Sequence, residues 1–118
     1  MYKRQSSQSL PKAAVKVLLN LALIAIEALV RGGTLEIALE EHPNGKAGAE
    51  IAVRASGPRI AFDPVVGRAL AGQLAPGELT SRTAPAAMIA QLAASNGGGI
   101  QYALADGMLV LGAMLPGG

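Results

Sequence analysis

The sequence contains no cysteine and no tryptophan, and only one histidine and one phenylalanine. Without cysteine, the chain can form neither a disulfide nor a thiolate-ligated zinc site, and it offers no thiolate nucleophile. His42 by itself cannot build a metal cluster. Because aromatic residues make up only 3% of the chain, base stacking on single-stranded nucleic acid is disfavoured. We therefore expect neither a metal nor another cofactor.

Apolar residues, by contrast, are abundant. They make up 51% of the 118 residues and are mostly Ala, Leu, Ile and Val. Only 15% of the residues are charged, so the chain can form a packed core and is not expected to be disordered. A length of 118 residues fits one domain. This composition suits helices packed on a sheet.

The formal net charge of +2 comes entirely from Lys3 and Arg4. The five residues Met1–Gln5 read like the translation of a common sequencing-adapter end, so we expect them to be non-native. Residues 1–10 are then a remnant or linker, and residues 11–118 are the domain. The basic balance consequently gives no evidence for a nucleic-acid partner.

An apolar stretch from Val17 to Val30 follows these basic residues, as it would in a signal peptide. However, Asn20 and Glu27 interrupt the stretch, and no small-residue cleavage site follows it. The stretch is also too short to span a membrane. We expect a cytoplasmic protein without a membrane partner.

Residues 11–30 are predicted to form one long helix, which the sequence Arg31-Gly-Gly33 ends. Its polar residues Lys16, Asn20 and Glu27 fall on one stripe. Because nearly everything else on the helix is apolar, most of its circumference is expected to be buried.

Two segments alternate cleanly between apolar and polar residues, residues 34–40 and 50–56, with an Asn-Gly turn signal between them. They predict an antiparallel hairpin. Its expected inward residues are Leu35, Ile37, Leu39, Ile51, Val53 and Ala55.

The rest of the chain predicts a short helix from Asp63 to about Leu70 and a second buried helix over residues 83–95. A second hairpin is expected to turn at Asp106-Gly107. Antiparallel strands with helices gathered on one face make an α+β two-layer sandwich.

Residues 16–29 (KVLLNLALIAIEAL), followed by Gly32-Gly-Thr-Leu-Glu-Ile37, resemble the N-box helix and next strand of histidine-kinase ATP-binding domains. The end of the chain resembles theirs as well, from Asn96-Gly-Gly-Gly-Ile100 through Asp106-Gly107 to Leu115-Pro116. The pattern is most similar to bacterial histidine phosphotransferases of the ChpT type. These keep the ATPase-like (Bergerat) fold but have dropped ATP binding.

The departures from the kinase pattern concern the nucleotide pocket. Asn20 keeps the first asparagine of the N-box, whereas Ile24 stands at the metal-binding position and has no oxygen to offer Mg²⁺. Glu27 stands at the basic position and puts a negative charge where a triphosphate would lie. The adenine box and the glycine-rich lid are missing from residues 57–82. The resemblance thus implies a degenerate, lidless pocket, although Lys16, Asn20 and Glu27 are also what an ordinary solvent face would show.

Among the surface candidates are Arg59, Phe62 and Arg68, because exposed arginine beside an apolar residue is typical of protein interfaces. Alternatively, Phe62 belongs to the core and the arginines only keep the surface soluble. Asp63 is most simply a helix cap. His42 precedes Pro43 in a turn with no carboxylate to orient it, so it is not expected to accept a phosphoryl group.

The resemblance implies a non-catalytic domain of a histidine phosphotransferase, which relays phosphoryl groups from a hybrid histidine kinase to response-regulator receivers. In that family the accepting histidine lies on an N-terminal helical hairpin that also forms the homodimer. A divergent ATP-binding kinase or ATPase of the same fold is the main alternative. An unrelated ligand-binding domain is a third, for which the sequence offers no polar constellation.

Overall fold

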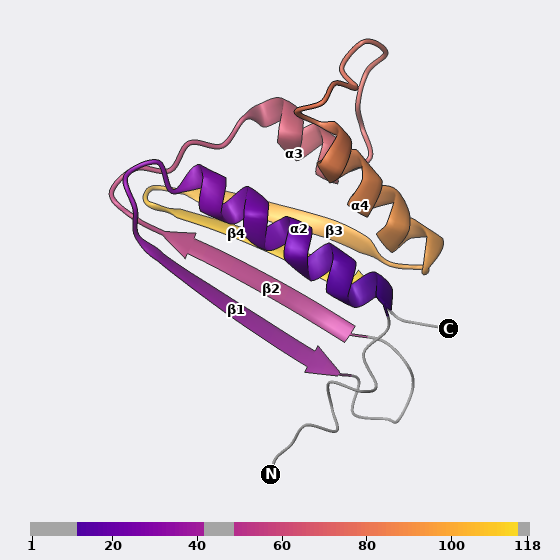
Figure 1. Ribbon diagram of the computed structural model, residues 1–118, viewed down its shortest axis with the longest axis horizontal. Helices are drawn as coiled ribbons and strands as arrows, with labels where there is room; N and C mark the ends of the chain where they lie inside the picture. Colours follow the sequence, from indigo (N-terminus) through magenta and orange to yellow (C-terminus); the bar gives the residue numbers. More distant parts are fainter. Residues whose placement is uncertain (1–11, 42–48, 116–118) are drawn as a thin grey trace.

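The computed structural model describes residues 12–41 and 49–115, in which three helices lie on one four-stranded sheet (Figure 1). The predicted α+β two-layer sandwich, with an antiparallel sheet and helices on one face, is confirmed. In chain order the elements are α2 (Lys12–Ala28), β1 (Thr34–Glu41), β2 (Ala49–Ser56), α3 (Pro64–Leu70), α4 (Ala84–Ser95), β3 (Gly99–Ala105) and β4 (Met108–Leu115).

Both predicted hairpins are present, and they join into one sheet with the strand order β1-β2-β4-β3. Every neighbouring pair is antiparallel, and β2 pairs with β4 in the middle. The register places Ile37 opposite Val53, and Val53 opposite Leu111. The alternating apolar residues of the strands therefore share one face of the sheet.

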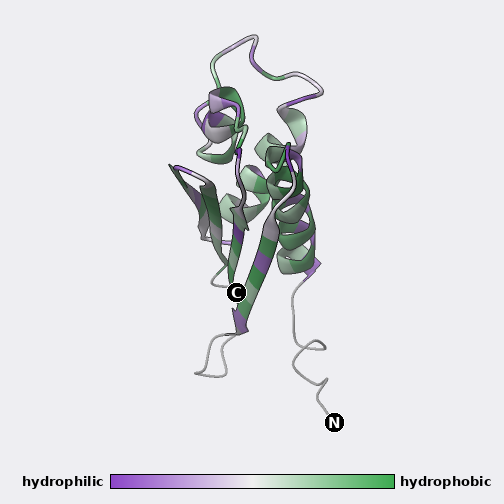
Figure 2. Cartoon of the chain, turned by 90° about the vertical axis from the view of Figure 1, so that its left-hand side faces the viewer, coloured by the Kyte–Doolittle hydropathy of each residue, from purple (hydrophilic) through white to green (hydrophobic). Residues whose placement is uncertain are grey.

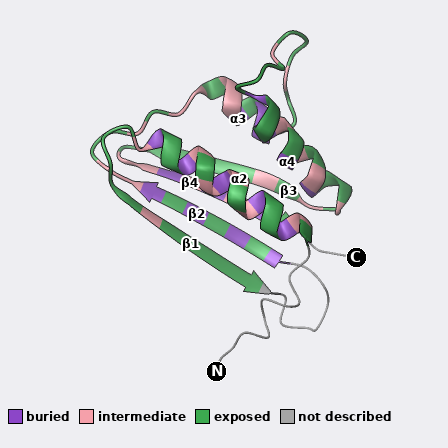
Figure 3. Cartoon of the chain, in the orientation of Figure 1, coloured by how far each residue is buried: buried purple, intermediate pink, exposed green. Residues whose placement is uncertain are grey.

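The helices cover that face. α2 lies along β2 and β4, while α3 and α4 lie on the side toward β3 (Figure 1). Hydrophobic residues dominate helices and strands alike (Figure 2). The core lies between the two layers, where Leu21 of α2, Val53 of β2 and Leu111 of β4 are fully buried (Figure 3).

Two local features fix how the elements join. At the start of α3, the Asp63 carboxylate accepts a hydrogen bond from the Val65 amide (3.0 Å), and Pro64 occupies the first helical turn, as predicted. Between α2 and β1, Gly33 has φ +142° and passes so close to β2 that a Cβ atom would lie 2.1 Å from the Ser56 carbonyl oxygen. Only glycine can occupy this position.

The prediction that most of the circumference of α2 is buried is wrong. One face, carrying Val17 and Leu21, is buried, whereas the side chains of Leu19 and Ile26 are 58% and 52% exposed. The physical reason is the position of the helix. α2 belongs to the outer layer of the sandwich, so its side away from the sheet, which carries Leu19 and Ile26, has no described element over it (Figure 1). The helix α4 is likewise buried on one face only, which carries Ile89.

Some sequence-based predictions fall outside the described residues. These include the turn at residues 42–46, with His42, and the proposed boundary at residues 10–11. Within the part of the chain that the structure describes, no helix is both long and apolar enough to cross a membrane.

Candidate functional site

A cavity of about 500 Å³ lies between α2, the start of α3 and the start of α4. The three α2 residues singled out in the sequence, Asn20, Ile24 and Glu27, all line it. Across from them lie Phe62 and Asp63, which precede α3. The fold thus brings four of the six sequence-predicted site residues into one cavity.

The α2 wall of this cavity offers little to a metal ion. The Asn20 side-chain amide donates to the Lys16 carbonyl oxygen (2.9 Å), so it is engaged within its own helix. Ile24 is apolar and packs partly against the core. Glu27 is exposed. Over residues 12–41 and 49–115, no group of three or more His, Cys, Asp or Glu side chains gathers to form a metal site.

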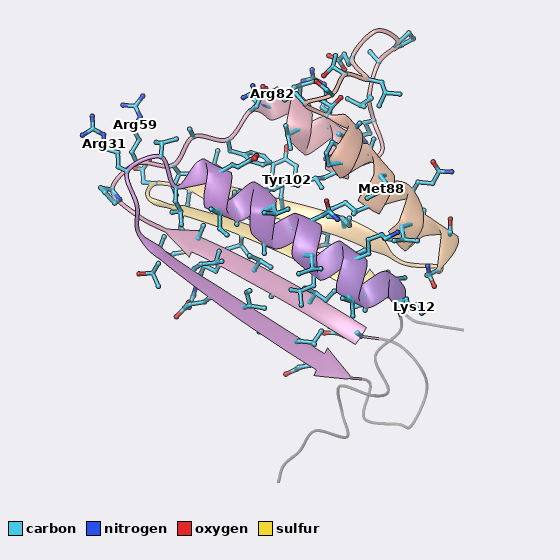
Figure 4. All side chains as sticks on the ribbon, viewed as in Figure 1. Lys12, Arg31, Arg59, Arg82, Met88 and Tyr102 are labelled. Atoms are coloured by element: carbon cyan, nitrogen blue, oxygen red, sulfur yellow. The ribbon has the colours of Figure 1, made fainter. Side chains whose placement is uncertain are left out.

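The opposite wall carries an ion pair that the sequence did not reveal. One Asp63 carboxylate oxygen caps α3, and the other forms a salt bridge with Arg82, with Nε 3.1 Å away. The Arg82 side chain is 73% exposed, and it lies beside the start of α3 (Figure 4). The sequence predicted Asp63 only as a cap. No local pattern connects it to Arg82, because only the tertiary fold brings the two residues together.

Phe62 contributes mainly to packing. Its ring lies 5.1 Å from the ring of Tyr102 on β3, centroid to centroid, with the ring planes tilted by 50°. Tyr102 in turn packs against α3 at Gly67, where a Cβ atom would lie 2.6 Å from the tyrosine ring. Phe62 is half-buried against the core. Its truncation would therefore disturb the fold as well as any interface.

Arg68 is engaged with the connection between α3 and α4. Its guanidinium group donates to the Glu78 carboxylate at 2.5 Å, and the same carboxylate accepts from the Ala75 amide at 2.9 Å. The Arg68 hydrogen bond, followed by that of Ala75, lowers the pKa of Glu78. The bond to Glu78 raises the pKa of Arg68.

The end of the same connection is held by Thr83, whose side chain is buried. Its hydroxyl donates to the Glu78 carbonyl oxygen (2.7 Å) and accepts from the Thr80 amide (2.9 Å). Side-chain bonds thus hold this connection at its middle and at its end.

Arg59 lies apart from this cavity, at one end of the molecule and beside Arg31 (Figure 4). Both residues are exposed, and neither takes part in a salt bridge with another described residue. Lys12 lies at the opposite end (Figure 4). Arg59 and Arg31 therefore form an exposed basic pair.

A larger cavity, of about 880 Å³, lies between the end of α3, the connection that follows it, and α4. Its lining is apolar or small except for the side chain of Gln91, and it contains no charged group. Although this cavity is larger, it has no group that could carry acid–base or phosphoryl chemistry. The smaller cavity beside α2 is the better candidate site.

Comparisons with known proteins agree with this architecture. The family described as the histidine phosphotransferase C-terminal domain matches residues 3–107. A bacterial phosphotransferase whose structure is known at 1.7 Å superimposes with a TM-score of 0.73 and is 28% identical. The match covers 88% of this chain and 49% of that protein, so the chain spans about half its length. No curated protein matches the sequence significantly.

The family match covers all of the described elements except β4, from α2 to the turn after β3. The structural match also covers most of this chain, 88%, and is supported by sequence identity as well as by shape. This chain belongs to the histidine phosphotransferase C-terminal domain family.

Proposed function

We propose that the chain is the non-nucleotide-binding C-terminal domain of a cytoplasmic histidine phosphotransferase in a bacterial two-component phosphorelay. The complete protein receives phosphoryl groups from a hybrid histidine kinase and passes them to response-regulator receivers. Its N-terminal helical hairpin carries the accepting histidine and forms the homodimer. The present domain helps to dock the receiver.

Two side chains in the cavity argue against nucleotide binding. Ile24 offers no oxygen ligand to Mg²⁺, which binds through carboxylates, carbonyls and water. Glu27 and Asp63 line the same cavity and would repel a triphosphate. Arg82, the one basic side chain in the lining, is already paired with Asp63.

The docking role rests on the exposed basic pair Arg31 and Arg59. A receiver has an acidic phosphorylation site, and surfaces of opposite charge steer two proteins together. During transfer the P–N bond of the phosphohistidine breaks while a P–O bond forms on the receiver aspartate. This requires the two groups to meet in line at near-contact distance. A domain that orients the receiver therefore accelerates transfer without touching the phosphoryl group.

Charge reversal at Arg59 tests this role in the full-length phosphotransferase. We expect Arg59→Glu to slow association with the receiver several-fold and to reduce the salt dependence of the association rate. Lys12→Glu is the matched control, since it changes the net charge equally at the opposite end of the domain. The measurement is stopped-flow phosphotransfer at several ionic strengths. Equal rates for Arg59→Glu and Lys12→Glu would remove Arg59 from the docking surface.

The other two sequence-predicted candidates need different controls. Phe62→Ala removes packing against Tyr102, so its effect on receiver binding must be compared with its effect on unfolding. Arg68→Ala frees the Glu78 carboxylate and loosens the connection between α3 and α4. If either variant weakens receiver binding while the unfolding midpoint stays unchanged, that residue contacts the receiver. If only the midpoint falls, its role is structural.

A further inference from the structure

The side of α2 that points away from the sheet is apolar. Val15, Leu19, Leu23 and Ile26 follow one another at spacings of four, four and three residues, so they form one stripe along the helix. All four side chains are exposed, and Leu23, near the middle of the stripe, is 58% exposed. On the opposite side of the helix, Leu21 is fully buried. We call Val15, Leu19, Leu23 and Ile26 the outer stripe.

The outer stripe has the spacing of a helix that packs against another helix. Steps of four and three residues keep apolar side chains on one line of contact between two helices. Among the described residues, no element lies over this side of α2 (Figure 1). Four large apolar side chains in one continuous stripe differ from the single exposed apolar residues of an ordinary surface, and they mark an interaction surface.

Two opposite charges flank the outer stripe on one side. Lys16 lies one turn before Asn20, and Asn20 and Glu27 line the same cavity, so Lys16 and Glu27 share one flank of α2. Both side chains are exposed, and neither takes part in a salt bridge with another described residue. They are eleven residues apart, which is about 16 Å along the axis and too far for an ion pair within one helix.

A second copy of this chain complements both the stripe and the charges. If two α2 helices pack antiparallel with the twofold axis beside Leu23, Leu19 of one copy faces Ile26 of the other. The charged flanks then lie on the same side of the dimer, and Lys16 comes within about 3 Å along the axis of Glu27 in the second copy. A parallel pair would place each charge beside an identical charge. The charges therefore select the antiparallel arrangement.

Two further charges lie at the ends of the helix. In the same arrangement Lys12 of one copy approaches Arg31 of the other, and both residues are exposed. Water and salt screen their repulsion at the rim, but it limits the strength of the contact. One helix face from each copy is also smaller than a standard protein interface, so we expect a weak and reversible dimer.

We propose that this chain forms an antiparallel dimer in which the outer stripes of two copies pack together and Lys16 of each copy pairs with Glu27 of the other. The helix layers meet in this dimer, and the sheets lie on its outside. Because Leu23 and Glu27 also line the candidate cavity, the contact places the cavity of each copy beside the interface. The inference does not depend on the receiver-docking role, since it rests on the side chains of α2.

Analytical ultracentrifugation of the 118-residue chain, from about 1 µM to about 1 mM, tests the dimer. We expect the mass to rise from monomer toward dimer. Leu23→Glu places two like charges at the twofold axis and should weaken association at least about tenfold. Leu79→Glu, at a residue 65% exposed between α3 and α4, is the matched control and should associate like the parent. A monomer at every concentration, or equal loss in both variants, would refute the proposal and leave the outer stripe to a different partner.

Exchanging the two charges tests the antiparallel arrangement. Lys16→Glu places a glutamate beside Glu27 of the second copy, and Glu27→Lys places a lysine beside Lys16, so each single variant should weaken association several-fold. The double variant that carries both substitutions should restore association to within about twofold of the parent. All of these side chains are exposed, so the unfolding midpoints should stay close to that of the parent. Single variants that associate like the parent, or a double variant no better than they are, would overturn the proposal.

Discussion

The two flanks of α2 differ sharply. On one flank, the helix meets α4 and the start of α3, and a cavity with a polar rim lies between them. On the other, toward the edge strand β1, no described helix lies beside it, and the outward-pointing Leu19 and Ile26 are exposed. Both flanks are rich in apolar residues, so the sequence alone cannot tell them apart. The comparison shows that an apolar helix face predicts packing against another element but does not show which element that is.

The largest expected effect contrasts a covered leucine with an uncovered one. Leu21→Ala removes a fully buried side chain and should lower the free energy of unfolding of this chain by about 2–5 kcal/mol. Leu19→Ala, at 58% exposure, should change it by about 0.5 kcal/mol. Chemical denaturation measures both. A Leu19→Ala effect as large as that of Leu21→Ala would mean that the side of α2 facing away from the sheet is covered in this chain.

The next effect concerns the turn between α2 and β1. In Gly33→Ala, the new Cβ atom would clash with the Ser56 carbonyl oxygen, and alanine would have to adopt a positive φ. The substitution should therefore lower the free energy of unfolding by at least about 1–3 kcal/mol. Gly67→Ala, on the covered side, meets only the tip of the Tyr102 ring, which can move. We expect its cost to be smaller, as thermal unfolding can show. A larger cost at Gly67 would mean that the packing of Tyr102 is more rigid than the turn.

A smaller effect belongs to the polar wall of the cavity. Asp63→Ala removes both the cap of α3 and the pair with Arg82, and should destabilise the domain by about 1 kcal/mol. Asp63→Asn keeps an oxygen that can cap α3, and Arg82→Ala removes only the exposed ion pair. Each of these variants should therefore lower the free energy of unfolding by less than Asp63→Ala does. These differences can be read from urea midpoints. If Arg82→Ala destabilises the domain as much as Asp63→Ala does, the ion pair contributes more to stability than the cap.

The smallest effect is the pH dependence of the pair between Glu78 and Arg68. The pKa of Glu78 is lower in the folded chain than its ordinary value. The pair therefore stabilises the fold fully above the ordinary glutamate pKa and loses this contribution as the pH falls through the lowered value. Comparing Glu78→Gln with the parent chain in acid titrations of stability isolates the effect. Because the pair is partly exposed, the difference should be slight.

Local patterns predicted much of the fold because the signals were local. Alternating residues gave both hairpins, and Asp63-Pro64 gave the start of α3. What the sequence missed depends on tertiary contacts. Nothing near Arg82 in the sequence indicates the contact with Asp63, and nothing near Arg68 indicates the contact with Glu78. The aromatic partner of Phe62, Tyr102, lies about forty residues later, on β3. The exposed apolar side of α2 was also not predicted, because helical periodicity does not show which apolar side chains pack against another element.

The degenerate cavity is the central claim, and it distinguishes a docking domain from a divergent ATPase of the same fold. A calorimetric titration of this chain with ATP and Mg²⁺, paired with a thermal-shift series, tests it most directly. Because the resemblance to the kinases assigns Ile24 and Glu27 to the metal and phosphate positions, we predict no heat of binding and no shift of Tm at millimolar nucleotide. A bound ligand at a hundred times its Kd would stabilise the fold by about 2.7 kcal/mol. A saturable shift of that kind would contradict the claim and identify the domain as an ATP-binding one.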